Sequence, residues 1–169
     1  QFIYSANPSR VLFGSGTSAQ LAEEISAMGC SHALILSTPQ QADLAEKICI
    51  DVGPLATGVF TEAAMHTPVA VTCEALKTAE HTTADCLVPV GGGSTIGLSK
   101  AIALRSGLPQ IAIPTTYAGS EMTPILGQTE DGVKTTQRTM KVLPEVVIYD
   151  VDLTLTLPIA LSVTSGINA

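Results

Sequence analysis

The residues with the clearest capacity for chemistry form a glycine-rich turn, Gly91-Gly92-Gly93-Ser94. The apolar run Asp85–Val90 before it is typical of a buried strand, and Ser94–Arg105 after it has the composition of a helix. Strand, glycine turn and helix in this order build a phosphate cradle, because glycine lets the backbone approach the anion and free N–H groups at the helix start face it. Ser94 is expected to cap the helix or to donate its hydroxyl to phosphate. The alternative is a turn that only caps the helix.

Two common nucleotide-binding motifs do not fit this turn. A Rossmann fingerprint needs a third glycine where Ile96 stands. A Walker A motif needs lysine where Leu98 stands, and Lys100 comes two residues late. The turn also follows a late strand, whereas the Rossmann fingerprint occupies the first strand-to-helix turn. The spacing therefore disfavours a P-loop ATPase.

Apolar runs and helical patterns alternate along the chain, which predicts an α/β fold: a Rossmann-like, mostly parallel sheet with helices on both faces. The predicted strands are Phe2–Tyr4, Arg10–Phe13, Ala33–Leu36, Leu55–Phe60, Asp85–Val90, Gln110–Ile113 and Val146–Tyr149. The predicted helices run from Thr17 as N-cap to about Met28, over Ala42–Ile50, from Thr67-Pro68 with proline in the first turn, over Ser94–Arg105, and from Pro158. The first two strands are expected to form a short N-terminal hairpin.

The last third of the chain differs from the rest in amino-acid composition. Residues 115–139 are rich in threonine and polar residues, which indicates a long loop with a hairpin around Asp131-Gly132. The sequence stops at Ala169 inside a helical pattern without a C-cap. We therefore expect the first part of a longer enzyme, with a nucleotide-binding domain over 1–160 and the start of a truncated helical domain over 161–169.

Composition excludes several classes of protein. The formal charge is −7 and no stretch is dense in Lys or Arg, which argues against a nucleic-acid partner. No apolar run approaches the roughly 20 residues of a membrane helix. The cysteines have no metal-ligand spacing, so we expect reduced, buried thiols, no zinc site and a cytoplasmic location. They are Cys30, Cys49, Cys73 and Cys86.

Several strings together resemble the iron-containing (group III) alcohol dehydrogenase family. They are VGGGS at 90–94, PTTYAGSE at 114–121, Lys141 followed by LPEVVIYD at 143–150, FGSG at 13–16 and LTLTLP at 153–158. The string at 115–124, TTYAGSEMTP, is the most specific to one branch. The resemblance covers nearly the whole chain, and its motifs are specific in combination.

The resemblance implies an NAD(P)-dependent oxidoreductase in which this chain is the N-terminal, cofactor-binding domain. A missing helical C-terminal domain would then supply most of the catalytic site, and the enzyme would be a homodimer. The branch implies reduction of the carbon–carbon double bond of maleylacetate to 3-oxoadipate, in aromatic-compound degradation. A metal-dependent alcohol or polyol dehydrogenase, and a stand-alone nucleotide-binding module, remain alternatives.

The resemblance also assigns residue roles. Gly92, Gly93, Ser94 and Thr95 would contact the pyrophosphate, and Thr115 and Thr116 the adenosine part. Tyr117 and Ser120 would also reach the cofactor, Glu121 would brace their loop, and Lys141 would lie near the nicotinamide ribose. His66 would contact cofactor or substrate. Loop threonines bonded to their own backbone, a surface lysine and an incidental histidine are the alternatives.

Cofactor preference and metal use follow from two further positions. The strand Ala33–Leu36 runs into Ser37-Thr38-Pro39, which holds neither an acid against the 2′-phosphate of NADP nor an arginine for it. We therefore expect both NADH and NADPH to be accepted. Asn168 stands where metal-dependent members of the family carry their first metal-binding aspartate, which implies an enzyme without a catalytic metal.

Overall fold

A computed structural model describes residues 9–168 of the protein. Its main sheet has the strand order β1-β8-β5-β4-β2-β3, and all five neighbouring pairs are parallel. The strands are β1 (Arg10–Gly14), β2 (Ala33–Leu36), β3 (Ala56–Phe60), β4 (Cys86–Gly91), β5 (Ile111–Pro114) and β8 (Val146–Asp150). The predicted parallel sheet is confirmed, whereas the predicted strand Phe2–Tyr4 of the N-terminal hairpin lies outside the described residues.

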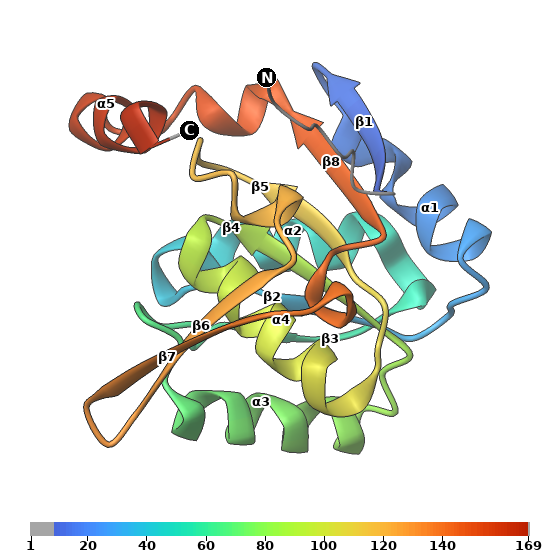
Figure 1. Ribbon diagram of the computed structural model, residues 1–169. Helices are drawn as coiled ribbons and strands as arrows, with labels where there is room; N and C mark the ends of the chain where they lie inside the picture. The colour runs from blue at the N-terminus through green and yellow to red at the C-terminus, as the bar shows by residue number, and fades with distance from the viewer. Residues whose placement is uncertain (1–8, 169) are drawn as a thin grey trace, which may run out of the picture.

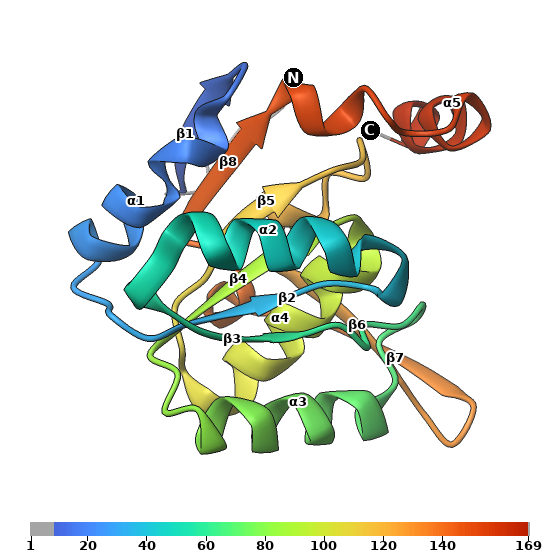
Figure 2. The same cartoon turned by 180° about the vertical axis from the view of Figure 1, so that it is seen from behind.

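Helices cover both faces of the sheet. The helices are α1 (Leu21–Ala27), α2 (Ala42–Val52), α3 (Val69–His81), α4 (Gly93–Ser106) and α5 (Ile159–Asn168). Figure 1 shows α4 in front of the sheet, and Figure 2 shows α2 in front of the opposite face. Alternate strand residues point to the two layers: Ile35 and Val88 belong to the core under α1 and α2, whereas Leu34 and Leu87 pack with α3 and α4. The central strands β2, β4 and β5 are therefore buried on both faces, as their continuous apolar sequences predict.

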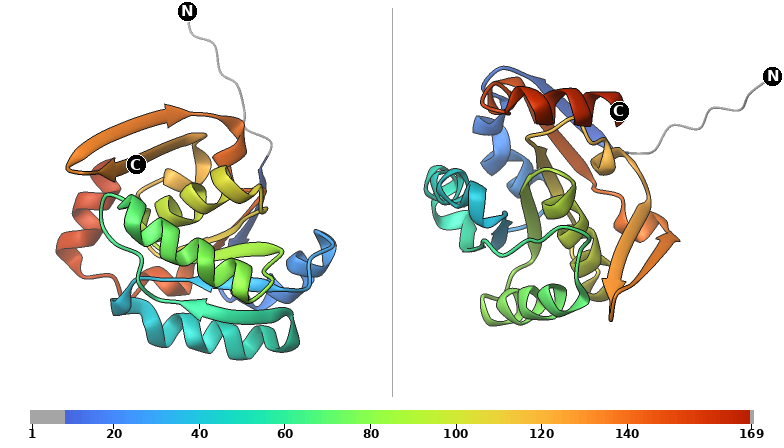
Figure 3. Two further views of the ribbon diagram at one scale, coloured as in Figure 1. Left: turned by 90° about the horizontal axis from the view of Figure 1, so that it is seen from below. Right: turned by 90° about the vertical axis from the view of Figure 1, so that its left-hand side faces the viewer.

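The polar segment after β5 forms a second, two-stranded antiparallel sheet. Its strands are β6 (Ile125–Glu130) and β7 (Val133–Arg138), and they pack beside α4 (Figure 3). Asp131 and Gly132 both have positive φ, 49° and 78°, as a two-residue type I′ turn requires. The hairpin predicted around Asp131-Gly132 is confirmed, and less of this segment is irregular loop than expected.

The predicted N-cap at Thr17 is wrong. Thr17 starts a 3₁₀ turn (Thr17–Gln20) ahead of α1, and its buried hydroxyl donates to the carbonyls of Gly14 and Tyr149. The carboxylate of Asp150, at the end of β8, accepts from the N–H groups of Gly16 and Ser18 instead. A distant strand thus supplies the cap that the sequence assigns to a local threonine.

One further expectation needs adjustment: Pro68 precedes α3 as its N-cap and does not lie in its first turn. The domain boundary expected between residues 160 and 161 stays a prediction, and α5 starts at Ile159. In the part of the chain that the structure describes, no helix is long and apolar enough to cross a membrane.

Candidate functional site

The strand order creates a crevice between the carboxyl ends of β2 and β4. The chain leaves β2 toward β3 on one side and leaves β4 toward β5 on the other. In open parallel sheets, ligands bind where the connections diverge in this way. Thr38 and Gln41 follow β2, and the three glycines connect β4, which ends at Gly91, to α4, which begins at Gly93. We call this region, with Thr115 and Thr116 after β5, the switch-point crevice.

Neighbouring side chains pack closely against the backbone of the glycine turn. Gly91 has φ 153°, and a Cβ built on it would lie 2.5 Å from Thr95 Oγ1 and 2.8 Å from Gln41 Oε1. A Cβ on Gly92 would lie 2.8 Å from Thr116 Cγ2. Any side chain at these two positions would therefore clash with the fold itself.

Gly93 differs, because its outer side is open. It is exposed, its φ is not positive, and a Cβ placed on it would have its nearest neighbour 3.9 Å away, at Ala118. Gly92 is the N-cap of α4 and provides no side-chain bond, so the first N–H groups of the helix lack a side-chain partner there. Ser94 lies in the first turn of α4 and does not cap it, whereas its other expected role, donation of its hydroxyl to phosphate, stays a prediction.

One buried hydroxyl under the turn lacks a partner. Thr95 is fully buried, and its Oγ1 makes no hydrogen bond within the described residues. An unpaired buried hydroxyl costs about 1–3 kcal/mol, so such groups are usually satisfied by something. The open face at Gly93, the free helix N-terminus and this hydroxyl together fit a phosphate group.

A pocket of about 490 Å³ adjoins the turn within the switch-point crevice. Polar side chains line one part of it and apolar side chains the other. The polar residues include Thr38, Gln41, Thr115 and Thr116, and the apolar ones are Leu153, Leu157, Pro158 and Leu161. Gln41 Nε2 donates to Thr115 Oγ1 at 2.8 Å, which links the ends of β2 and β5 across the crevice. A polar rim and an apolar wall suit a nucleoside. Sequence reasoning missed Gln41, although its place just after a buried strand was a usable signal.

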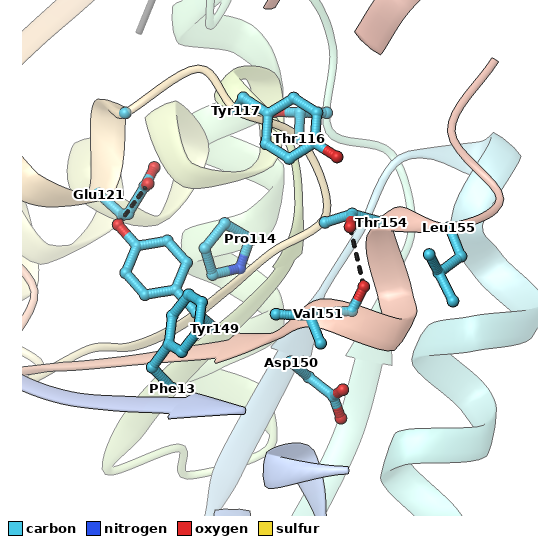
Figure 4. Close-up of a pocket in the computed structure, with 11 residues that line it drawn as sticks. Phe13, Pro114, Thr116, Tyr117, Glu121, Tyr149, Asp150, Val151, Thr154 and Leu155 are labelled. Carbon is cyan, nitrogen blue, oxygen red and sulfur yellow. Dashed lines mark hydrogen bonds between the residues drawn. The ribbon is translucent and has the colours of Figure 1, made fainter. Parts of the chain in front are cut away.

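A second pocket, of about 510 Å³, lies over the carboxyl ends of β1, β5 and β8 (Figure 4). Phe13 and Tyr149 form its aromatic wall, with ring centroids 6.3 Å apart. Tyr149 donates to Glu121 Oε1 at 2.8 Å, and burial together with this carboxylate raises the pKa of Tyr149. Glu121 thus braces the loop after β5, as expected. Thr116 lines both pockets and connects this one to the crevice.

The structure places the other predicted residues at different distances along the chain and sheet from the switch-point crevice. Tyr117 is partly exposed beside the second pocket, and its N–H donates to Ser165 Oγ of α5 at 3.3 Å. Ser120 is half-buried, and its carbonyl accepts from Lys100. Lys141 is exposed in the 3₁₀ turn Met140–Val142. That turn precedes β8, whereas the glycine turn follows β4, so the parallel sheet does not bring Lys141 to the crevice.

His66 lies in the loop after β3, at the carboxyl edge of the sheet. It is exposed, and both His66 and Thr67 have positive φ, 66° and 48°. Thr67 Oγ1 lies 2.5 Å from where a Cβ on Gly97 would be, so this loop packs against the second turn of α4. Left-handed backbone at two consecutive non-glycine residues is uncommon and is held here by that packing.

Lys100, which falls outside the Walker A register, does not face the crevice. It is fully buried, and its Nζ donates to the carbonyls of Ser120, Thr123 and Ile125 at 2.5, 2.6 and 3.0 Å. Burial lowers its pKa to about 8, although the carboxylate of Glu121 acts in the opposite direction. Lys100 therefore holds the segment between β5 and β6 and is not a phosphate ligand.

The sequence of this chain matches the model of a known protein family. Residues 8–151 match "Iron-containing alcohol dehydrogenase", and the chain belongs to that family. Among curated proteins, it is 61% identical over 168 residues to a maleylacetate reductase of Rhizobium sp. (strain MTP-10005) and 54% identical over 169 residues to one of Sphingobium indicum. These alignments cover 99% and 100% of this chain but 48% of each relative.

A solved structure agrees with the sequence comparison. The crystal structure of maleylacetate reductase from Agrobacterium tumefaciens superposes with a TM-score of 0.96 at 61% identity, over 99% of this chain and 48% of that one. The chain thus spans about half the length of the relatives it matches.

The family is named after iron, but the described side chains of the switch-point crevice do not form a set of metal ligands. Among residues 9–168, the group of three metal-ligating side chains that lie close enough to share an ion is Cys30, Asp85 and Cys86. Those residues lie at the amino-terminal ends of β2 and β4, away from the glycine turn. The described residues therefore offer no cluster of metal ligands beside the switch-point crevice.

Proposed function

We propose that this chain is the NAD(P)H-binding part of an enzyme that reduces the carbon–carbon double bond of maleylacetate to 3-oxoadipate. The observation that carries the proposal is the phosphate cradle, in a chain 54–61% identical to maleylacetate reductases. The reduced nicotinamide supplies a hydride to one alkene carbon, and a proton must reach the other. The task of this chain is to bind and orient the cofactor.

In this proposal the crevice holds the pyrophosphate and the adenosine part of the dinucleotide. Gly92, Gly93, Ser94 and Thr95 bind the pyrophosphate, supported by the free N-terminus of α4 and the unpaired hydroxyl of Thr95. Thr115 and Thr116 contact the adenosine part, and Gln41 orients Thr115. Both threonines line the pocket beside the turn, and Gln41 reaches Thr115 at 2.8 Å.

Three further assigned residues lie on loops around the crevice. Tyr117 and Ser120 contact the cofactor from the loop after β5, and Tyr117 lines the neighbouring pocket. His66 contacts cofactor or substrate from the loop packed on α4. Lys141 is assigned to the nicotinamide ribose by the family resemblance alone, because its turn precedes β8 and the sheet does not bring it to the crevice.

A helical C-terminal domain completes the enzyme in this proposal, and two copies form a homodimer in the cytoplasm. Exposed apolar side chains on one face of α5 support a packing partner for that helix, because a continuous apolar surface is rarely left uncovered. They are Ile159, Val163 and Ile167, which are spaced four positions apart and are 84%, 55% and 80% exposed. The resemblance alone supports the dimer.

The proposed enzyme accepts NADH and NADPH and uses no catalytic metal. Neither an acid nor an arginine follows β2 to select between the two cofactors. Asn168 replaces the aspartate of metal-dependent relatives, and a neutral amide attracts a divalent cation far less than a carboxylate does.

The test is oxidation of NADH by the full-length enzyme with maleylacetate as substrate. We expect turnover by the full-length enzyme and none by the 169-residue chain, because hydride transfer needs the acceptor held about 3–3.5 Å away. Alcohol oxidation that depends on added iron or zinc, without maleylacetate reduction, would instead support a metal-dependent alcohol or polyol dehydrogenase. NADH binding with no reductase activity in any longer form would support a nucleotide-binding module.

A further inference from the structure

A second cluster of reactive side chains lies at the amino-terminal edge of the sheet. Cys30 precedes β2, and Asp85 and Cys86 stand at the start of β4. The ligand atoms of these three residues all lie within 4.8 Å of one another. The cofactor crevice lies at the carboxyl ends of the same two strands, so the proposed reductase activity does not use this cluster.

Local hydrogen bonds hold the cluster in place. The Asp85 carboxylate accepts from the N–H groups of Ser31 and His32, both at 2.8 Å, and the N–H of Asp85 donates to the His32 carbonyl at 2.9 Å. The N–H of Cys30 donates to the carbonyl of Ile25 at the end of α1. The loop between α1 and β2 is thereby fixed against β4, and the cysteines, 56 positions apart, are brought together.

The donor set suits a thiophilic divalent cation. Two sulfurs and a carboxylate oxygen within 4.8 Å can converge on one ion with metal–ligand distances of about 2.0–2.3 Å after small side-chain movements. His32 is not one of the three residues whose ligand atoms lie within 4.8 Å of one another, but its exposed Nδ1 lies 3.5 Å from Asp85 Oδ2. A rotation of this exposed side chain would be needed to bring it to the ion as a fourth donor. Cysteine, histidine and carboxylate ligands in a four-coordinate site are typical of zinc.

The site is partly open to solvent. Cys86 is fully buried, whereas Cys30 and Asp85 are half-buried and His32 is exposed. An ion can therefore enter from the surface and reach a buried sulfur. The separation of Cys30 from Cys86 along the chain explains why sequence spacing predicts no zinc site.

We propose that Cys30, Asp85 and Cys86, with His32 as the fourth ligand, bind a thiophilic divalent cation such as Zn²⁺. The ion would join the end of α1 to the starts of β2 and β4 and would act in stability and not in hydride transfer.

Co²⁺ titration of the full 169-residue chain, kept reduced, tests the proposal. We expect one Co²⁺ per chain, thiolate-to-cobalt absorption in the near ultraviolet, tetrahedral bands in the visible, and displacement by one equivalent of Zn²⁺. Cys30→Ser should weaken binding at least about 100-fold, because even partners outside the first ligand shell contribute about 10–100-fold. Cys49→Ser is the matched control, since Cys49 is also half-buried, and should bind Co²⁺ normally.

Three results would overturn the proposal: no cobalt bands with folded wild-type chain, equal binding by Cys30→Ser, or a Cys30–Cys86 disulfide with no binding after reduction. Circular dichroism establishes folding for each variant. His32→Ala offers a second measure, because it removes the proposed fourth ligand from an exposed position and should weaken Co²⁺ binding without unfolding the chain. Equal binding by His32→Ala would remove that residue from the ligand set.

Discussion

Gly93 is the residue of the turn where a side chain tests function separately from folding. A Cβ there has only Ala118 Cβ as a neighbour, at 3.9 Å, and a valine would occupy the space predicted for phosphate. We expect Gly93→Val to fold and to bind NADH at least about tenfold more weakly, equivalent to about 1.4 kcal/mol. Ala70→Val, at an exposed position in the first turn of α3, is the control for a β-branched residue. Unchanged NADH affinity in folded Gly93→Val would refute the phosphate cradle.

Thr38 tests which end of the crevice holds the adenosine ribose. It follows β2 and lines the pocket beside the turn. A carboxylate there would repel a 2′-phosphate, so Thr38→Asp should lower kcat/KM for NADPH at least about tenfold relative to NADH. Thr136→Asp adds the same charge at an exposed position on β7 and should not change the ratio. An unchanged ratio in Thr38→Asp would move the ribose elsewhere.

The sequence predicted the glycine turn but missed the contacts of Gln41 and Cys30, for a physical reason. The turn was predictable because its strand, turn and helix are contiguous in the sequence. Gln41 contacts Thr115 from 74 positions away, and Cys30 meets Cys86 from 56 positions away, so both pairings depend on strand order. Local sequence does not encode which strands become neighbours, and such contacts appear only in the folded sheet.

At the scale of elements, Lys100 ties α4 to the segment between β5 and β6. Its ammonium donates to three backbone carbonyls that have few alternatives in a buried site. Lys100→Met should lower the free energy of unfolding by about 3 kcal/mol, because it leaves buried acceptors without a donor. Lys77→Met removes only an exposed pair with Glu74 and should have little effect. Urea unfolding of both variants compares them, and equal losses would refute this role.

Asp150 joins β8 to the 3₁₀ turn before α1 and makes that junction sensitive to pH. Burial raises its pKa, but hydrogen bonds from Ser18, Gly16 and Asp152 outweigh burial and leave the pKa below its ordinary value. The unfolded chain therefore takes up the proton first as pH falls. The stabilisation is complete above about pH 4 and is lost as pH drops through the folded-state pKa.

The variant Asp150→Asn measures that contribution. It should cost about 2 kcal/mol of unfolding free energy at pH 7, where wild type has the ionised acceptor. The difference between the two proteins should shrink as the pH is lowered below about 4. Asp131→Asn, in the exposed hairpin turn, is the control. A difference that stays constant from neutral pH down to about pH 3 would show that the Asp150 charge is not responsible.

Elements were more predictable than their junctions. Continuous apolar runs identified β2 and β4, and Asp131-Gly132 identified a hairpin, because these signals are local. The segment before α1 was predicted wrongly, because Asp150, more than 130 positions away, binds the N–H groups of Gly16 and Ser18 at the 3₁₀ turn that precedes the helix. Cysteine burial was also overestimated: Cys86 is buried, but Cys73 lies exposed on α3.

At the scale of the whole molecule, the two ends of the parallel strands, here called the carboxyl edge and the amino edge of the sheet, have separate predicted roles. The switch-point crevice, with its proposed cofactor, lies at the carboxyl edge. The cluster of Cys30, Asp85 and Cys86 lies at the amino edge. Metal content alone therefore cannot decide whether the full-length enzyme is a metal-dependent dehydrogenase. A zinc ion at the amino edge and a catalytic ion at the other edge would give the same stoichiometry.

Chelation separates the two cases. We expect the full-length enzyme to keep its reductase activity after dialysis against a chelator, while its Tm falls, because an ion bound only to the folded state stabilises that state. In Cys30→Ser the chelator should change neither activity nor Tm. Activity lost on chelation and restored by iron or zinc, in wild type and Cys30→Ser alike, would place the ion in catalysis. That result would overturn the metal-free mechanism and favour the alcohol dehydrogenase alternative, whereas a chelation-insensitive Tm would contradict only the amino-edge site.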